Sequence, residues 1–286
     1  MRRLRAREHE PILGRAPARA VDGAAVRNSQ QRPGTVAATP AAEFRRSAFQ
    51  VLAPHEAGLL EQSQLCESLS SRTRAEVAAR VVRRRIERGQ HLVREGDTDE
   101  SIHMVLSGRL KVVATSLDGD EFIVSFLHPG DCAGTVAAVD GGPSPVSVTA
   151  HAPSELLTLL PDDVKALSSR WAEFALGLAR MLSASLREAN ERLGDAHFYD
   201  LRTRVARCLA DMEEHCAPSA QVEMGTAIPL TQAELAAMLG AGRSRVNKIL
   251  NDFQHEGVIT LSRRSMTIVD LPRLRQSARL EPGAED

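Results

Sequence analysis

The chain has 286 residues and a mass of 31.0 kDa, enough for about two domains. Hydrophobic residues make up 43% and charged residues 26%, which is typical of a globular protein with a sizeable core. An aromatic content of 3% argues against a lectin that stacks carbohydrate on aromatic rings and against an aromatic platform for single-stranded nucleic acid. Four scattered cysteines without a CxxC pair argue against disulfides or a zinc ribbon. We therefore expect a cytoplasmic protein without a metal site and, since no long uncharged stretch occurs, without a membrane span.

The net charge of −1 hides a division along the chain. Residues 1–46 carry ten basic and four acidic side chains, residues 47–225 carry 18 and 26, and residues 226–279 carry eight and four. An acidic body followed by a basic module is typical of a regulator whose last part meets phosphate. Residues 1–46 lack a sustained apolar period and are predicted to be a disordered extension, with a DNA-contacting arm as the alternative. Residues 276–286 are predicted to be a flexible tail.

The segment from Leu65 to Arg88 has apolar residues near a helical period and is predicted to be a helix. Short alternating runs separated by glycines follow at the spacing of strands, and Asp118-Gly119 is a good hairpin turn. These features predict a sandwich, a roll or a barrel of short strands. The predicted strands include His91–Val93, Ile102–Leu106, Arg109–Val113, Phe122–Leu127, Val146–Thr149 and Leu156–Leu160.

A long amphipathic helix is predicted over residues 171–197, after a short helix from Pro161 to Leu167. Its apolar residues recur at steps of four, four, three and four, which is close to the spacing of a two-stranded coiled coil. We therefore expect this helix to form a homodimer interface; the alternative is that the stripe packs against its own domain. The expected interface residues are Leu178, Leu182, Leu186, Ala189 and Leu193.

Two helices broken at a glycine are predicted between Leu230 and Leu250. Thr231 followed by Glu234 is a capping box, which begins a helix, and Gly240 can supply the positive φ of a tight turn. This spacing is typical of a helix-turn-helix, whose second helix lies in the major groove of DNA. An ordinary helical hairpin with a solvated charged face is the alternative.

Two short strands around residues 262–265 extend this unit into a winged helix-turn-helix over residues 198–275. Basic and polar side chains lie at the N-terminal part of its second helix and at the tip of the wing, where they would contact bases and phosphates. The expected DNA-binding residues are Thr231, Gln232, Arg243, Ser244, Arg245, Asn247, Lys248, Arg263 and Arg264.

The order of a glycine-punctuated roll, a long helix and a winged helix resembles the CRP/FNR family of bacterial transcription regulators. The resemblance implies an α+β fold with a cyclic-nucleotide-binding-like β-roll of the double-stranded jelly-roll type over residues 62–168. It also implies a dimerisation helix and a DNA-binding domain that acts on an inverted-repeat operator. Double-stranded DNA and a second copy of the chain are then the expected partners, and RNA polymerase is a candidate partner. The segments that match best are Arg94-Glu-Gly-Asp, Val105-Leu-Ser-Gly-Arg-Leu-Lys-Val, Pro129-Gly-Asp and Leu230 to Leu250.

The expected effector pocket departs from this family pattern. Cyclic-AMP binders of the family carry Gly-Glu and, about ten residues later, an Arg that pairs with the cyclic phosphate. Here Gly134 is followed by Thr135, and the Arg position and the next fall on Pro145 and Val146. The positions that would meet the purine fall near Ala189 and Asn190. We therefore predict a degenerate pocket that does not bind cyclic AMP tightly, with no cofactor and an unknown effector.

An enzyme is the alternative from another class, because a β-roll with several histidines could hold iron as cupins do. No His-x-His pair occurs, no nucleophile motif appears, and the winged helix would be unexplained, so no catalytic residue is expected. Cys132 lies near the expected pocket, where a buried, inert thiol is favoured over an oxidisable one. We likewise expect the histidines of the roll to be surface or core residues.

Overall fold

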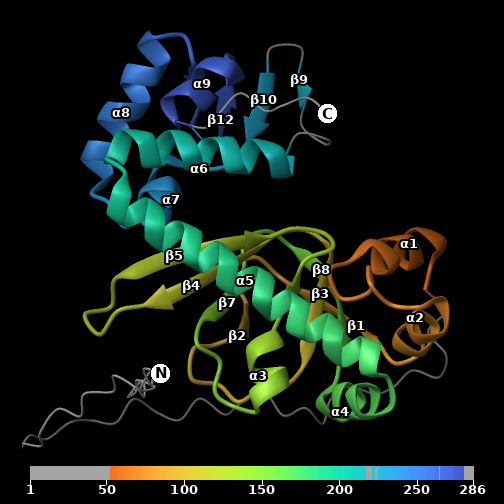
Figure 1. The fold of residues 1–286 in the computed structure, drawn as a ribbon. Coiled ribbons are helices and arrows are strands. Elements are labelled where there is room, and N and C mark those ends of the chain that lie inside the picture. Colours follow the sequence, from red (N-terminus) through yellow and green to blue (C-terminus); the bar gives the residue numbers. More distant parts are fainter. Residues whose placement is uncertain (1–51, 217–220, 223–224, 264, 280–286) are drawn as a thin grey trace, which may run out of the picture. The chain divides into compact units, whose positions relative to one another are not determined.

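The computed structural model describes residues 52–216, 221–222, 225–263 and 265–279 (Figure 1). The predicted extension over residues 1–46, part of the predicted tail over residues 276–286 and Arg264 lie outside this part of the chain. The described part of the chain begins with two short helices, α1 (Pro54–Gln62) and α2 (Ser71–Ala78). The N-cap of α2 is Ser70, whose hydroxyl accepts a hydrogen bond from the backbone N–H of Thr73.

The next strands form a roll of two antiparallel sheets. The strand order is β1-β8-β3-β6 in the first sheet and β2-β7-β4-β5 in the second. A short helix, α3 (Thr135–Asp140), connects the two sheets between β6 and β7. The strands are β1 (Val82–Ile86), β2 (His91–Val93), β3 (Ile102–Ser107), β4 (Leu110–Thr115), β5 (Glu121–Leu127), β6 (Cys132–Ala133), β7 (Ser147–Ala150) and β8 (Ser154–Leu159).

Alternation along these strands gives the roll two apolar layers. One layer fills the space between the sheets and includes Ile86, Val105 and Leu156. The other covers the outer face of the first sheet, where Met104 and Leu157 pack against α1, α2, α4 (Pro161–Arg170) and the first turns of α5 (Ala172–Phe198). The roll predicted from the glycine-punctuated strands is confirmed.

The helix predicted from Leu65 to Arg88 is wrong over much of its length. Only Ser71–Ala78 is helical, and the chain then forms strand β1. This strand pairs in antiparallel register with β8, so that Arg84 lies opposite Leu156. The apolar residues at 77, 81 and 82 fit a helical period, but pairing with a strand about 70 residues away decides the local structure.

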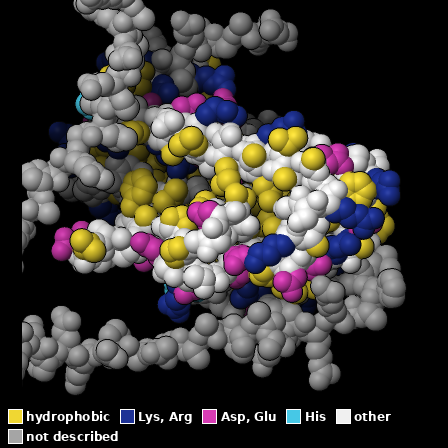
Figure 2. All heavy atoms as spheres, turned by 60° about the horizontal axis from the view of Figure 1, so that its bottom comes forward, with side chains coloured by type: hydrophobic (Ala, Val, Ile, Leu, Met, Phe, Trp, Pro, Cys, Tyr) yellow, Lys and Arg dark blue, Asp and Glu magenta, His cyan; other side chains and the backbone are white. Residues whose placement is uncertain are grey.

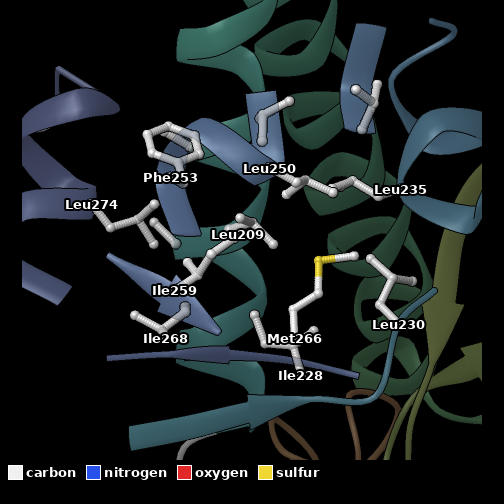
Figure 3. Close-up of a cluster of buried hydrophobic side chains, with 14 of the residues drawn as sticks. Leu209, Ile228, Leu230, Leu235, Leu250, Phe253, Ile259, Met266, Ile268 and Leu274 are labelled. Atoms are coloured by element: carbon white, nitrogen blue, oxygen red, sulfur yellow. The ribbon is translucent and has the colours of Figure 1, made fainter. Parts of the chain in front are cut away.

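The C-terminal domain packs four helices against a third antiparallel sheet, with strand order β11-β12-β10-β9. Its core is formed by apolar residues from every one of these helices and from three of the strands (Figure 3). Leu209, Leu250 and Phe253 are fully buried there. The elements are α6 (Leu201–Cys216), β9 (Gln221–Val222), β10 (Gly225–Ile228), α7 (Gln232–Met238), α8 (Arg243–His255), β11 (Ile259–Leu261), β12 (Met266–Ile268) and α9 (Leu271–Ser277).

Candidate nucleic-acid interface and effector site

Helices α7 and α8 are joined by a tight turn at Gly240, whose φ is +57°. The predicted capping box is present. The Glu234 carboxylate accepts hydrogen bonds from the backbone N–H and the hydroxyl of Thr231, at 2.8 and 2.7 Å, while the hydroxyl accepts from the Glu234 N–H at 3.2 Å. Leu235 and Ala236 are buried against α8 and the rest of the domain. The two helices therefore form the predicted helix-turn-helix.

The N-terminal part of α8 presents its basic side chains to solvent. Arg243, Arg245 and Lys248 are exposed, and in the described part of the chain no acidic side chain forms an ion pair with them. Ser244 is exposed beside them, whereas Asn247 is half-buried and its side-chain oxygen is enclosed. This face of α8 thus carries three free cations and a hydroxyl, which is what a helix needs to meet phosphates and base edges.

The wing and the first helix supply the other predicted DNA contacts. Arg263 is exposed between β11 and β12, in a turn that is held by hydrogen bonds between Ser262 and Ser265, including Ser265 N to Ser262 Oγ at 3.2 Å. Thr231 and Gln232 are half-buried at the start of α7, and the hydroxyl of Thr231 is used in the capping box. Arg264 lies outside the described residues.

Four residues of the expected effector pocket come from the two ends of the segment between β6 and β7, and the other two, Ala189 and Asn190, are exposed on α5. Gly134 has φ +89° and begins α3; a Cβ there would lie 2.2 Å from the carbonyl oxygen of Ser101, so only glycine fits. Thr135 is the half-buried first residue of α3. Pro145 is exposed and Val146 half-buried in the loop before β7. None of these four side chains carries a charge.

Two arginines could have compensated for this missing charge. Arg94 is exposed in a turn. Its backbone N–H donates a hydrogen bond to Asp97 Oδ2 at 3.0 Å, which closes the turn. Arg109 is buried; its guanidinium lies 3.7 Å from the ring centroid of Phe126 and donates to the carbonyl oxygen of Pro229 at 2.5 Å. Arg109 is thus engaged at Pro229, two residues before the N-cap of α7, rather than at Thr135.

Cys66, Cys132 and His103 lie among the packed residues of the roll. Burial raises the pKa of the Cys66 thiol to about 11 and also raises the pKa of the Cys132 thiol, which favours the protonated form of both at neutral pH. His103 is buried, and its Nδ1 lies 2.9 Å from the hydroxyl of Thr158. Within the described residues, no group of His, Cys, Asp or Glu side chains is arranged to hold a metal ion.

Helix α5 carries two stripes of residues, and the structure separates them. Of the five predicted interface residues, Leu178 is 3% exposed and packs into its own roll, Leu182 is half-buried, and Leu186, Ala189 and Leu193 are exposed. A second, fully exposed stripe follows alternating steps of four and three along the whole helix, a heptad pattern that sequence analysis missed. We call it the α5 seam; it consists of Ala172, Leu176, Ala179, Ser183, Leu186, Asn190, Leu193 and His197.

Comparison with known proteins agrees with this architecture. A family model described as cyclic nucleotide-binding domain matches residues 83–170, and one described as Crp-like helix-turn-helix domain matches residues 203–277. A CRP-like cAMP-activated global transcriptional regulator of Mycobacterium tuberculosis is 31% identical over 192 residues, which cover 67% of this chain and 86% of that protein. The chain belongs to the CRP/FNR family. It is therefore a transcription regulator with a helix-turn-helix DNA-binding domain, in a family of regulators and not of enzymes.

This CRP/FNR regulator is also similar to the cyclic AMP receptor protein of Thermus thermophilus, at 30% identity over 68% of the chain and 88% of that protein. The chain also matches the solved structure of a CRP/FNR-family transcriptional regulator from the same organism. The match covers 69% of this chain and 98% of that one, with a TM-score of 0.59 and 24% identity. That likeness concerns the fold alone. The fold is the predicted α+β architecture. None of the helices in the described part combines the length and hydrophobicity that crossing a bilayer requires.

Proposed function

We propose that this CRP/FNR regulator is a homodimer that binds an inverted-repeat operator with one α8 helix in each of two major grooves. The observation that carries the proposal is the α5 seam, because its eight exposed positions keep the four-three alternation of a coiled coil through the 27 residues of α5. Leu176, Leu186 and Leu193 are 56%, 62% and 70% exposed, which leaves three large apolar side chains in water on one helix. A second copy would cover them.

The composition of the α5 seam supports a parallel pair of helices. Ala179 and Ser183 are small, which allows two backbones to approach closely, and Asn190 occupies an a position of the heptad. A single asparagine at such a position favours pairing with the same residue of a partner helix and fixes the register. On the face of the molecule drawn in Figure 2, hydrophobic side chains lie at the surface. Pairing in this register relates the two α8 helices by a twofold axis.

Selection from a pool of random duplexes tests the proposal. We expect the enriched sequences to contain an inverted repeat whose half-site centres lie about one helical turn apart, roughly 34–36 Å, because each subunit presents one recognition helix. Enrichment of a single half-site or a direct repeat would contradict the symmetric dimer. RNA polymerase remains a candidate partner of the DNA-bound regulator.

We further propose that cyclic AMP does not control this regulator, although the names of both relatives above refer to cyclic AMP. The cyclic phosphate is an anion, and its transfer from water to a site without a cation is costly. Thr135, Pro145 and Val146 supply no charge, and Arg109 is engaged with Phe126 and Pro229. The pocket is thereby left for a less anionic effector or for none.

Calorimetry and operator binding with cyclic AMP check this proposal. We expect no binding with a dissociation constant at or below about 10 μM and no change in operator affinity at micromolar nucleotide. The double variant Thr135→Glu with Pro145→Arg should gain measurable affinity, because it restores the charged contacts of the family's cyclic-AMP binders. Val136→Glu with Pro143→Arg is the matched control, with the same charges at neighbouring exposed positions, and should gain none. Tight binding by the unaltered protein would refute the proposal.

A further inference from the structure

The start of the recognition helix α8 has little local support. Its N-cap residue is Gly242, which has no side chain to accept a hydrogen bond from the first turn, and the turn before it consists of Gly240 and Ala241. Backbone hydrogen bonds close this turn, from Ala241 N to Ala236 O at 3.0 Å and from Arg245 N to Gly242 O at 3.0 Å. Because no side chain caps α8, contacts from elsewhere in the domain contribute to the direction in which α8 leaves the turn.

An arginine of α6 reaches this turn from outside the helix-turn-helix. The Arg204 guanidinium donates a hydrogen bond from Nη2 to the carbonyl oxygen of Leu239 at 2.6 Å. Leu239 is the C-cap of α7, where carbonyl groups lack intrahelical donors and a cation is favourable. Arg204 lies 35 residues before Leu239, and its side chain is part-buried between the two helices. This contact fixes the end of α7 immediately before Gly240.

A second arginine of α6 holds the other end of α8. Arg202 Nη2 contacts both carboxylate oxygens of Glu256, at 2.7 and 2.8 Å, and its guanidinium lies 4.2 Å from the ring centroid of Phe253. Glu256 is the C-cap of α8, and its carbonyl oxygen accepts a hydrogen bond from Arg273 Nη1 at 2.8 Å. Helix α6 thus contacts the last residues of both helices of the helix-turn-helix.

From these contacts we infer that Arg204 is a positioning residue for DNA recognition, which sets the angle at which α8 presents Arg243 and its neighbours. It acts through the carbonyl of Leu239 and does not itself contact DNA. Loss of its hydrogen bond releases the glycine-containing turn, so the base contacts become misaligned. Phosphate attraction, which depends on charge more than on angle, is retained.

The test compares Arg204→Met, which keeps an unbranched apolar stem but has no donor, with the unaltered protein on operator and on random duplex across a salt series. We expect operator affinity to fall about tenfold, as for the loss of one charged hydrogen bond, with random-duplex affinity within about twofold. The slope of affinity against salt should be unchanged. Arg275→Met is the matched control, because Arg275 lies in the same domain and pairs with Glu214 at 3.4 Å, and it should leave both affinities unchanged.

Three results would overturn the inference. Equal losses on operator and random duplex with a salt slope lower by about 0.9 for each subunit, or about 1.8 for the dimer, would make Arg204 a phosphate contact. Unchanged operator affinity would remove any role. An Arg204→Lys variant as weak as Arg204→Met would show that a donor at this position is not what matters, and this variant also serves if Arg204→Met does not fold.

Hydrogen exchange of the DNA-free protein separates this inference from the proposed dimeric function on which the operator assay rests. Arg204→Met should speed exchange of the backbone N–H groups of residues 239–245, and exchange in α5 and the roll should be unchanged. Unchanged exchange in the turn would contradict a positioning role even if no operator were found. Faster exchange together with failure to select an inverted repeat would count against the dimer and not against Arg204.

Discussion

Leu186→Glu is expected to convert the regulator into a folded monomer that has lost tight operator binding. Leu186 occupies a d position of the α5 seam and is 62% exposed in the single chain, so the substitution removes nothing from the core of its own domain. In the dimer it replaces two facing leucines, each worth about 1.5–3 kcal/mol when buried, with two like charges. We expect the dimer dissociation constant to rise by at least about 100-fold, measured by sedimentation.

Two controls identify the seam. Ser185→Glu adds the same charge at an exposed position of α5 outside the seam and should leave the dimer and its DNA affinity unchanged. Leu178→Glu alters the first residue of the originally predicted interface, which is buried in its own roll, and should lower the melting temperature of the protein. A Leu186→Glu protein that sediments as a dimer and binds operator normally would refute the α5 seam as the interface.

Arg243→Ala is expected to weaken operator binding by about 1–3 kcal/mol per half-site, roughly 5- to 150-fold, and to relax the preference at one base pair in each half-site. Arg243 is the first residue of α8 and is exposed. A guanidinium at that end of a recognition helix can donate two hydrogen bonds to one base edge, and alanine donates none. Competition binding with operators changed at single base pairs measures both effects.

Arg263→Ala provides the contrast for this prediction. Arg263 is exposed in the wing, and a phosphate contact there would strengthen binding to all sequences alike. Its loss should weaken operator and random duplex equally and lower the salt slope by about 0.9 for each subunit, or about 1.8 for the dimer. If Arg243→Ala behaved in this same uniform way, Arg243 would be a phosphate contact and the assignment of α8 to base reading would be wrong.

The helix-turn-helix could be predicted from sequence because everything that defines it is local. The capping box of Thr231 and Glu234, the positive φ of Gly240 and the buried face of α8 all lie within about 25 residues, and each has a sequence signal. Strands of the roll that are bounded by glycines were predictable for the same reason. Strand β1 was not, because three consecutive arginines carry no strand signal and the pairing of Arg84 with Leu156 is long-range.

The dimer interface illustrates a different limit. Helix α5 has one apolar stripe that packs on its own roll through Leu178 and a second, the α5 seam, that contains Ala179, Ser183 and Asn190. A prediction based on the largest side chains places leucines from both stripes in a single interface. Only the fold shows which stripe the roll has already covered. The contacts of Arg109 and Arg204 with backbone carbonyls were equally beyond prediction, because a carbonyl acceptor leaves no mark in the sequence.

The α5 seam contains two small side chains, Ala179 and Ser183, between the leucines at residues 176 and 186. The separation of two packed helices follows the bulk of the side chains between them, within about 8–10 Å. In the proposed dimer, the two helices therefore approach most closely at Ala179 and Ser183 and are farther apart at Leu186 and Leu193. The small volume of Ala179 and Ser183 then helps to set the distance between the two α8 helices. That distance determines how many base pairs separate the two half-sites of the operator.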